Sequence, residues 1–226
     1  MSLFDEHKAE RRERILDAAR KLVAERGYDG LTMRDLARAA KVSVPTLYNL
    51  FGSKDAILVT ELEAMASTIA RALPMTGESF LQRGRAAFDA GMQIIEASPA
   101  FFRAVIQMFM TSTETAETRM RVEQGFVAVM EANLRAAQQA GQLADWASPA
   151  IVARHMYQIH AASFLGWGLG HIDFETFRAA TLSGCAHLLA GVARGPFAVE
   201  VLAELEKLQP PLQHLIDKEA RDVAAR

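Results

Sequence analysis

Residues 32–51 read Thr-Met-Arg-Asp-Leu-Ala-Arg-Ala-Ala-Lys-Val-Ser-Val-Pro-Thr-Leu-Tyr-Asn-Leu-Phe, and this stretch decides the fold. Thr32 is a good N-cap, and the apolar residues after it repeat at helical spacing as far as Ala40. Ser43 is a second N-cap. It is followed by Pro45 in the first turn, where the missing N–H of a proline costs nothing. The stretch therefore predicts two short helices joined by a tight turn, a helix-turn-helix.

The second of these helices has an outer face that suits a groove of nucleic acid better than a protein core. Counting about 100° per residue places Leu47 and Phe51 on the inner face. The outer face and its shoulders are small, amide-bearing and aromatic, and consist of Pro45, Thr46, Tyr48 and Asn49.

An earlier apolar stripe completes a three-helix unit. A helix of about 11–25 carries apolar residues at i, i+3, i+4, i+7 and i+8, namely Ile15, Ala18, Ala19, Leu22 and Val23. Gly27 is expected to end this helix and Gly30 to permit the bend that follows. Three short helices bury little apolar surface alone, so the helix that begins near Ser53 is expected to close their core. Its stripe is Leu58, Leu62 and Met65.

Several short runs in this region form a recognisable set. They are Arg-Ile-Leu-Asp-Ala-Ala-Arg (14–20), Gly27-Tyr28, Leu31-Thr32, Asp35-Leu36-Ala37, Val42-Ser43 and Leu47-Tyr48-Asn49-Leu50-Phe51-Gly52-Ser53-Lys54. The set resembles the TetR family of bacterial transcriptional regulators over residues 11 to about 62; beyond these, only length and helical character are similar. Lys41 stands where a glycine is usual, which predicts a mild left-handed strain in the turn. Leu50 stands where a histidine is frequent.

The resemblance implies an all-α protein. Its three-helix DNA-binding head, with the helix-turn-helix, would be joined to a larger helical domain for ligand binding and dimerisation. We expect the head at residues 1–52, the regulatory and dimerisation domain at 53–209 and a mobile C-terminal tail at 210–226. The expected helices after the head are 53–73, 78–97, 99–110, 113–140, 149–168, 173–193 and 195–208, with the last ended by Pro210 and Pro211.

Composition and charge agree with this organisation. The 226 residues, 50% of them hydrophobic, suffice for one small and one medium domain. The lone Cys185 favours a reducing, cytoplasmic location. The charged start argues against a signal peptide, and no apolar run approaches the ~20 residues that span a bilayer, so no membrane partner is expected.

The charge distribution is a weak argument for nucleic acid, and the placement of the cations is a stronger one. Residues 1–60 hold eleven Lys and Arg against nine Asp and Glu, an excess that a solvated surface explains equally well. Five cations are expected at helix starts, where they would grip phosphates: Lys8, Arg11, Arg12, Arg34 and Lys54.

Residue chemistry separates the expected DNA contacts into two groups. Asparagine pairs with adenine, arginine with guanine, and apolar groups with the thymine methyl, so these types read bases. The candidate base contacts are Arg34, Val44, Pro45, Thr46 and Asn49. Phosphate contacts position the protein without specifying a sequence. The candidates are Thr32, Ser43, Tyr48 and Lys54.

The middle of the chain is rich in aromatic residues and methionine. An ordinary helical core explains this about as well as a ligand pocket, and the resemblance favours the pocket. The candidate lining residues are Phe88, Met92, Phe102, Phe109, Phe126, Met130, Tyr157 and His160. The expected effector is a small hydrophobic or aromatic molecule.

The two helices at 149–168 and 173–193 are rich in small residues, which let helix axes approach closely. They would suit the inner helices of a monomer, but the resemblance implies a dimeric four-helix interface and hence a homodimer. The candidate interface residues are Ala162, Gly166, Ala180 and Gly184.

No cofactor, metal site or enzymatic activity is expected. His155 and His160 are five residues apart, roughly 140° around a helix, and no Cys or carboxylate stands beside them at ligand spacing. The chain lacks a phosphate loop, a Gly-x-Ser-x-Gly elbow and a His-Glu-x-x-His motif.

Two hypotheses of function follow. The first is a ligand-responsive DNA-binding transcriptional regulator, foremost a repressor that a small effector releases from a palindromic double-stranded operator. The alternative is a structural DNA-binding protein that uses the same head without an effector. Few genomic sites would favour the first hypothesis and widely scattered sites the second.

Overall fold

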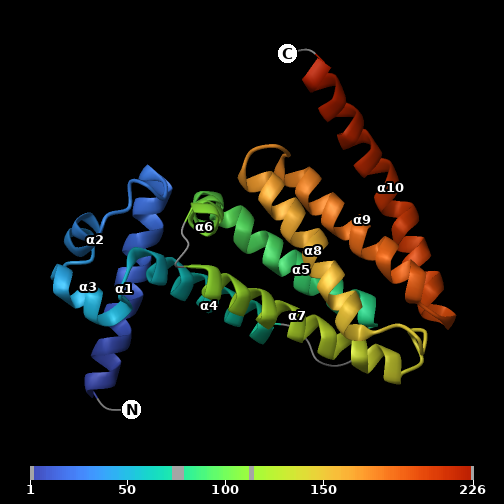
Figure 1. The fold of residues 1–226 in the computed structure, drawn as a ribbon, viewed down its shortest axis with the longest axis horizontal. Coiled ribbons are helices and arrows are strands. Elements are labelled where there is room, and N and C mark those ends of the chain that lie inside the picture. The colour runs from blue at the N-terminus through green and yellow to red at the C-terminus, as the bar shows by residue number, and fades with distance from the viewer. Residues whose placement is uncertain (1–2, 73–78, 112–114, 225–226) are drawn as a thin grey trace. The chain divides into compact units, whose positions relative to one another are not determined.

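A computed structural model describes residues 3–72, 79–111 and 115–224 of the chain. Within these ranges, helices account for the regular structure, apart from an isolated β-bridge between Leu143 and Ala193. The helices are α1 (Leu3–Arg26), α2 (Met33–Ala39), α3 (Val44–Phe51), α4 (Lys54–Ala72), α5 (Phe80–Ala97), α6 (Pro99–Thr111), α7 (Ala116–Gln139), α8 (Pro149–Gly168), α9 (Phe174–Val192) and α10 (Gly195–Ala224) (Figure 1). The predicted all-α fold class is confirmed.

The chain forms two compact units. The first comprises Met1–Leu73 and Asp89–Arg119, and the second Pro74–Phe88 and Met120–Arg226. The first unit therefore contains the helix-turn-helix together with α4 and α6, and the second contains α8, α9 and α10. The domain boundaries expected from the sequence divide the chain differently and stay a prediction.

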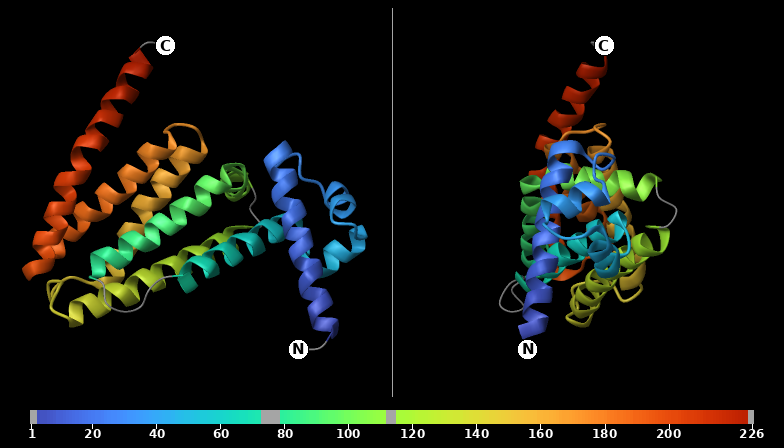
Figure 2. Two further views of the ribbon diagram at one scale, coloured as in Figure 1. Left: turned by 180° about the vertical axis from the view of Figure 1, so that it is seen from behind. Right: turned by 90° about the vertical axis from the view of Figure 1, so that its left-hand side faces the viewer.

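In the first unit, α1 to α4 share one apolar core. Helices α2 and α3 lie on the same side of α1 in two opposite views (Figures 1 and 2). The predicted stripe of α1 is buried, and so is Leu58 of α4, whereas Leu62 is half-buried and the side chain of Met65 lies outside the described residues. Each of the four helices contributes side chains with no exposed surface: Ile15, Val23, Leu36, Leu47, Ile57 and Leu58.

An ion pair fixes α1 against α4 within this unit. Arg20 of α1 pairs with Glu61 of α4 and with Asp17, one turn earlier on α1. The Glu61 side chain is only 4% exposed. A carboxylate that is buried so deeply needs a charged or hydrogen-bonding partner, so the pair defines how α1 and α4 align.

The predicted N-caps of the helix-turn-helix are present. Thr32 Oγ1 accepts a hydrogen bond from the Asp35 N–H at 3.1 Å, and Ser43 Oγ accepts one from the Thr46 N–H at 3.2 Å. Pro45 lies in the first turn of α3, as expected. Local side chains thus define where both helices begin.

Helix α1 is longer than predicted. It begins at Leu3 rather than near residue 11. The first eight residues carry no apolar stripe, so the pattern did not reveal them, but they include good helix formers that extend the helix. The expectation that Lys8, Arg11 and Arg12 lie at a helix start is therefore wrong, since all three lie along α1. The helix ends as predicted before Gly27, which has a left-handed φ of 67°.

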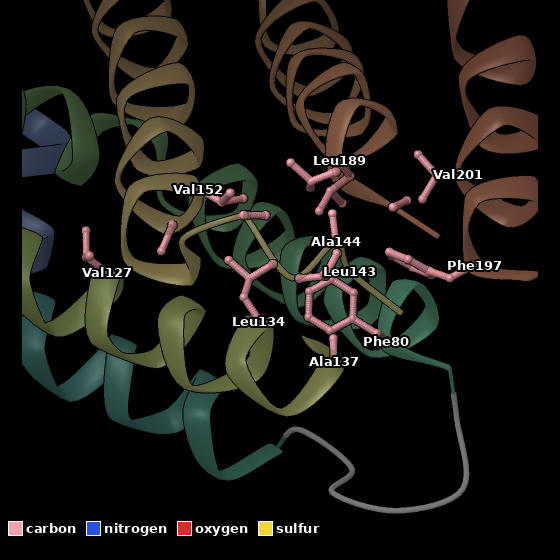
Figure 3. Packing of buried hydrophobic residues seen from close by; sticks show 14 residues of the cluster. Phe80, Val127, Leu134, Ala137, Leu143, Ala144, Val152, Leu189, Phe197 and Val201 are labelled. Atoms are coloured by element: carbon pink, nitrogen blue, oxygen red, sulfur yellow. The ribbon is translucent and has the colours of Figure 1, made fainter. Parts of the chain in front are cut away.

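The core of the second unit joins five helices and a loop (Figure 3). Its buried side chains include Phe80, Leu134, Leu143, Val152, Leu189, Phe197 and Val201. The rings of Phe80 and Phe197 meet edge to face with centroids 5.6 Å apart. The loop between α7 and α8 is held to the core because the Gln138 amide donates to the carbonyls of Ala144 at 2.9 Å and Ala147 at 2.8 Å.

Helices α8 and α9 approach each other closely, as their small residues predict. A Cβ on Gly184 of α9 would lie 2.7 Å from Cγ2 of Ile159 on α8, closer than real Cβ atoms come. Gly184 therefore faces α8 of its own chain, and its small size is explained by packing within one protomer.

Helix α10 continues past the two prolines that were expected to end it. It extends to Ala224 and contains Pro210 and Pro211, so the predicted end at Leu208 is wrong. Prolines remove two backbone hydrogen bonds, but the helix on either side remains tied to α9, with Lys218 Nζ 3.6 Å from Asp173 Oδ2 at the start of α9. Tertiary contacts outweigh the local helix-breaking signal.

The close approach at Gly184 predicts opposite effects of one substitution at two glycines. Gly184→Ala should lower the free energy of unfolding by about 1–3 kcal/mol, because Ile159 must shift. Gly125→Ala is the matched control: nothing lies within 4 Å of a Cβ there, so the better helix former should stabilise α7 by roughly 0.5–1 kcal/mol. Urea denaturation measures both. A stabilised Gly184→Ala protein would show that α8 and α9 are not in this contact.

Candidate nucleic-acid interface

The outer face of α3 is exposed as the sequence predicts. Pro45 and Asn49 are exposed, Val44 and Thr46 are half-buried, and Tyr48 is 53% exposed. Leu47 is the buried residue of this helix. The candidate contacts on α3 therefore share one accessible surface of the helix.

The hydroxyls at the start of α3 are paired with each other. Ser43 Oγ and Thr46 Oγ1 lie 2.8 Å apart, and Ser43 Oγ also caps the helix. Only one of the two O–H groups donates within this pair, so the other remains able to donate to a phosphate or to a base. The structure brings these two candidates together at the N-terminus of α3, where the helix dipole favours anions.

The cationic side chains of α2 are exposed to solvent. Arg34 is exposed, while Asp35 accepts from Thr32 Oγ1 at 3.0 Å and from Arg38 Nη1 at 3.2 Å. The Arg38 side chain is 82% exposed. Arg38 was not among the predicted contacts, although it lies on α2 one turn after Arg34 and its position was a usable signal.

The Lys54 side chain, a candidate phosphate contact, is held against Tyr28. Its ammonium lies 3.9 Å from the centroid of the Tyr28 ring and 3.5 Å from the Tyr28 carbonyl oxygen. The Tyr28 hydroxyl donates to Asp55 Oδ1 at 2.7 Å. The first turn of α4 is thus joined to the turn that follows α1, and Lys54 keeps N–H donors for a phosphate.

The turn between α2 and α3 carries the strain that the sequence predicts. Lys41 has a φ of 52°, in the left-handed region where a glycine would be unstrained. Such a conformation costs an L-residue about 1–2 kcal/mol. The Ala40 carbonyl, directly before Lys41, accepts from Arg14 Nε at 3.0 Å. Nothing in the sequence pattern indicated this contact, because Arg14 lies 26 residues away.

The candidate ligand residues are divided between the two units. Met92, Phe102 and Phe109 belong to the first unit, where Met92 and Phe102 are buried and Phe109 is half-buried. The second unit holds the remaining candidates, which are Phe88, Phe126, Met130, Tyr157 and His160. Phe126 is 38% exposed. The assignment of these residues to a pocket stays a prediction.

His160 belongs to an aromatic cluster of α8 and α9. Its ring centroid lies 5.9 Å from that of Phe164 and 5.6 Å from that of Phe177. The cluster continues through Trp167 and Phe174. Burial lowers the pKa of His160 to about 4, so the imidazole is neutral at pH 7. Burial likewise raises the pKa of the Cys185 thiol to about 11.

The candidate dimer residues differ in exposure. Ala162 is exposed on α8, whereas Gly166, Ala180 and Gly184 are half-buried. A Cβ on Gly166 would lie 3.5 Å from the Ile172 side chain, an ordinary contact. Ala162 is therefore the candidate with the freest surface, and the interface as a whole stays a prediction.

Two features are absent from the described part of the chain. No group of three His, Cys, Asp or Glu side chains there is arranged to hold a metal ion. No helix there combines the length and apolar character needed to cross a membrane.

The exposed, capped α3 and its support by α1, α2 and α4 define a helix-turn-helix protein with a further all-helical part. The sequence profile of the bacterial regulatory proteins of the tetR family matches residues 15–60. The match covers the helix-turn-helix and the helices that support it, and in this region the chain is similar to regulators of the TetR family.

Known proteins agree with this assignment. Over 108 residues the chain is 33% identical to the HTH-type transcriptional repressor KstR of Rhodococcus jostii, covering 47% of the chain and 51% of KstR. The curated relatives it matches are thus aligned over about a quarter to a half of their length.

Solved structures extend the likeness in fold to about four fifths of the chain. SmeT, the repressor of the Stenotrophomonas maltophilia multidrug efflux pump SmeDEF, superposes with a TM-score of 0.66 at 20% identity, covering 82% of this chain and 92% of SmeT. FadR of Bacillus subtilis in complex with stearoyl-CoA gives a TM-score of 0.65 at 17% identity, covering 79% and 98%. At these identities the likeness concerns the fold alone.

Burial of His160 predicts that folding stability falls as the pH decreases from about 6.5 towards 4. The folded protein keeps the imidazole neutral in this window, whereas an unfolded chain takes up a proton near pH 6.5. The free energy of unfolding should therefore decrease by up to ~1.4 kcal/mol per pH unit, and His160→Phe should remove that part of the decrease. Urea denaturation between pH 7 and pH 5 measures it. His155→Phe, at an exposed position on α8, is the control, and equal slopes for His160→Phe and wild type would contradict the prediction.

Proposed function

We propose that the protein is a ligand-responsive, DNA-binding transcriptional regulator that acts as a repressor. A small hydrophobic or aromatic effector releases it from a palindromic operator in the cytoplasm. The observation that carries the proposal is the exposed, capped face of α3, which is held on the core of the first unit by Leu47. The major groove of B-DNA admits such a helix and offers each base pair a distinct set of donors and acceptors.

The exposed groups of α2 and α3 divide the work of recognition. Asn49 and Arg34 have the chemistry to pair with adenine and guanine, and Thr46, Val44 and Pro45 complete the base-reading set. The phosphate-binding set is Thr32, Ser43, Tyr48 and Lys54. Support for this division comes from side-chain chemistry and not from exposure, since both sets contain exposed residues, such as Asn49 in the first and Tyr48 in the second.

Two copies of the chain act together in this proposal. One head reads only a few base pairs, so useful specificity needs two half-sites whose palindromy mirrors the symmetry of a dimer. Helices α8 and α9 supply the interface, with Ala162 on its accessible side and Gly166, Ala180 and Gly184 allowing the helices to pack closely. Half-sites about one turn of DNA apart, or a multiple of it, are expected in any selected operator.

The effector acts through α6. This helix packs against α1 and α4 in the first unit, and its side chains Phe102, Val105 and Met108 are buried. Near its end, Gln107 Nε2 donates to Asp29 Oδ2 at 2.8 Å, in the turn between α1 and α2. The preceding residue, Tyr28, binds the start of α4 through Asp55. A ligand that moves α6 therefore pulls on the turn from which the helix-turn-helix begins.

The class of effector is proposed from the apolar residues and from a structural relative. FadR of Bacillus subtilis, which shares the fold, binds stearoyl-CoA. The buried Met92 and Phe102 and the half-buried Phe109 favour a ligand with an apolar part. The ligand must bind the form that does not bind DNA more tightly, since equal affinity for both forms shifts nothing.

Asn49→Ala and Lys54→Met should weaken DNA binding in different ways. The operator is first selected from random duplexes by the wild-type protein. Asn49→Ala should then lose about 1–3 kcal/mol of discrimination at the base it reads. Lys54→Met keeps the side-chain stem over Tyr28 and should weaken all duplexes alike, with the salt slope reduced by about 1. Fluorescence anisotropy at several salt concentrations separates the two effects. Equal loss on every sequence by both variants would contradict the division of roles.

The effector proposal predicts reciprocal linkage. A thermal-shift screen with stearoyl-CoA and aromatic carboxylic acids should find a compound that stabilises the protein. The affinity for that compound should be measured with and without operator. The operator should weaken compound binding by the same factor by which the compound weakens operator binding. Gln107→Leu should reduce this factor and leave affinity for the compound unchanged. If no stabilising compound alters DNA affinity, the effector part of the proposal is wrong and a DNA-binding protein without an effector is the better account.

A further inference from the structure

We propose that Arg12 and Arg14 of α1 are positioning residues for DNA recognition. Each holds the C-terminal carbonyl of one helix of the helix-turn-helix, and together they fix the orientation in which α3 presents its outer face. The inference rests on the proposed function, because it assumes that α3 reads DNA.

The two recognition helices are too short to hold their own orientation. Helix α2 has 7 residues and α3 has 8. Isolated helices of this length are not stable in water, and their last carbonyls lack intrahelical partners. The N-termini are fixed by the caps at Thr32 and Ser43. The contacts that hold the C-termini therefore decide the orientation of each helix.

Arg12 holds the C-terminus of α3. Its Nη1 donates to the Leu50 carbonyl oxygen at 3.0 Å, and its guanidinium carbon lies 4.5 Å from the centroid of the Phe51 ring. The helix ends directly afterwards at Gly52, which has a left-handed φ of 85°. A planar cation that both donates to the last turn and stacks on its final aromatic ring restrains rotation as well as translation. Asn49, the candidate adenine reader, immediately precedes Leu50.

Arg14 holds the C-terminus of α2 at the strained turn. Its Nε donates to the Ala40 carbonyl oxygen at 3.0 Å. Lys41 follows in the left-handed region at φ 52°. Backbone hydrogen bonds close this turn, from the Lys41 N–H to the Arg38 carbonyl at 3.3 Å and from the Val42 N–H to the Ala37 carbonyl at 3.0 Å. The hydrogen bond from Arg14 adds a side-chain restraint that ties the turn, and with it the start of α3 at Ser43, to α1.

A competing role for both arginines is phosphate binding, since a guanidinium has five N–H groups and only one from each is used here. The two roles differ in what they change. A phosphate contact contributes equally to specific and non-specific duplexes and adds to the salt slope. A positioning residue aligns the base contacts, so its loss lowers the ratio of specific to non-specific affinity and leaves the slope unchanged.

The test uses the full-length protein, its selected operator and a scrambled duplex of equal length. Arg12→Gln and Arg14→Gln should each lower the ratio of operator to scrambled affinity about tenfold, the size of one misaligned base contact. The salt slope should stay at the wild-type value. Arg11→Gln, at an exposed neighbouring position on α1, is the matched control and should keep the wild-type ratio. Arg12→Lys, which keeps the cation but not the planar stack, should restore part of the ratio.

A second substitution separates the two arginines. Lys41→Gly removes the left-handed strain, so it should restore most of the ratio in Arg14→Gln and none of it in Arg12→Gln. Circular dichroism identifies any variant that is not folded, and Arg12→Lys then supplies the comparison. The inference is overturned if both duplexes lose affinity equally with a reduced slope, which means phosphate contact, or if the ratio does not change. A wild-type protein that selects no sequence would instead overturn the proposed function, and the inference with it.

Discussion

Burial of Leu47 is the interaction on which the rest of the helix-turn-helix depends. Leu47 is the buried side chain of α3, and burying a leucine contributes about 1.5–3 kcal/mol. Ordering the backbone of one residue costs about 1–2 kcal/mol, so eight ordered residues cost more than this one contact supplies. Half-buried side chains of α3 such as Leu50 and Phe51 contribute as well, and so do the ends of the helix, where the structure shows the Ser43 cap, Gly52 and the Arg12 hydrogen bond.

In the proposed function, the small number of contacts that hold the helix-turn-helix would let a weak signal from an effector reach DNA. The Gln107–Asp29 hydrogen bond is exposed, and a bond of this kind contributes about 0.5–1.5 kcal/mol net. Coupling free energies between ligand and effector sites are typically 1–3 kcal/mol. One hydrogen bond and the apolar packing of α6 on α1 and α4 are therefore of the size that regulation requires. A far stronger link would hold the head in one state, and no ligand of ordinary affinity would release it.

Sequence reasoning succeeded where the signal is local. The caps at Thr32 and Ser43, the stripe of α1 and the left-handed Lys41 all follow from residues within a few positions of one another. It failed where a side chain serves a distant backbone group. Arg12 and Arg14 bind carbonyls 38 and 26 residues away, and an arginine in a polar stretch looks the same with or without such a partner. The predicted end of α10 at Leu208 was wrong for a related reason, because distant contacts with α9 outweigh the helix-breaking effect of two prolines.

Different physical demands on the two parts of the chain explain why its likeness to known proteins is uneven. A head that enters the groove of B-DNA meets a ligand of fixed dimensions, so cap, turn and inner-face residues have few alternatives. The helices of the second unit need only fill a core, and cores accept many apolar combinations of similar volume. Sequence similarity therefore concentrates in residues 15–60, while the rest keeps its fold as its residues diverge. Freedom to change there is what would let one DNA-reading head serve effectors of different chemistry.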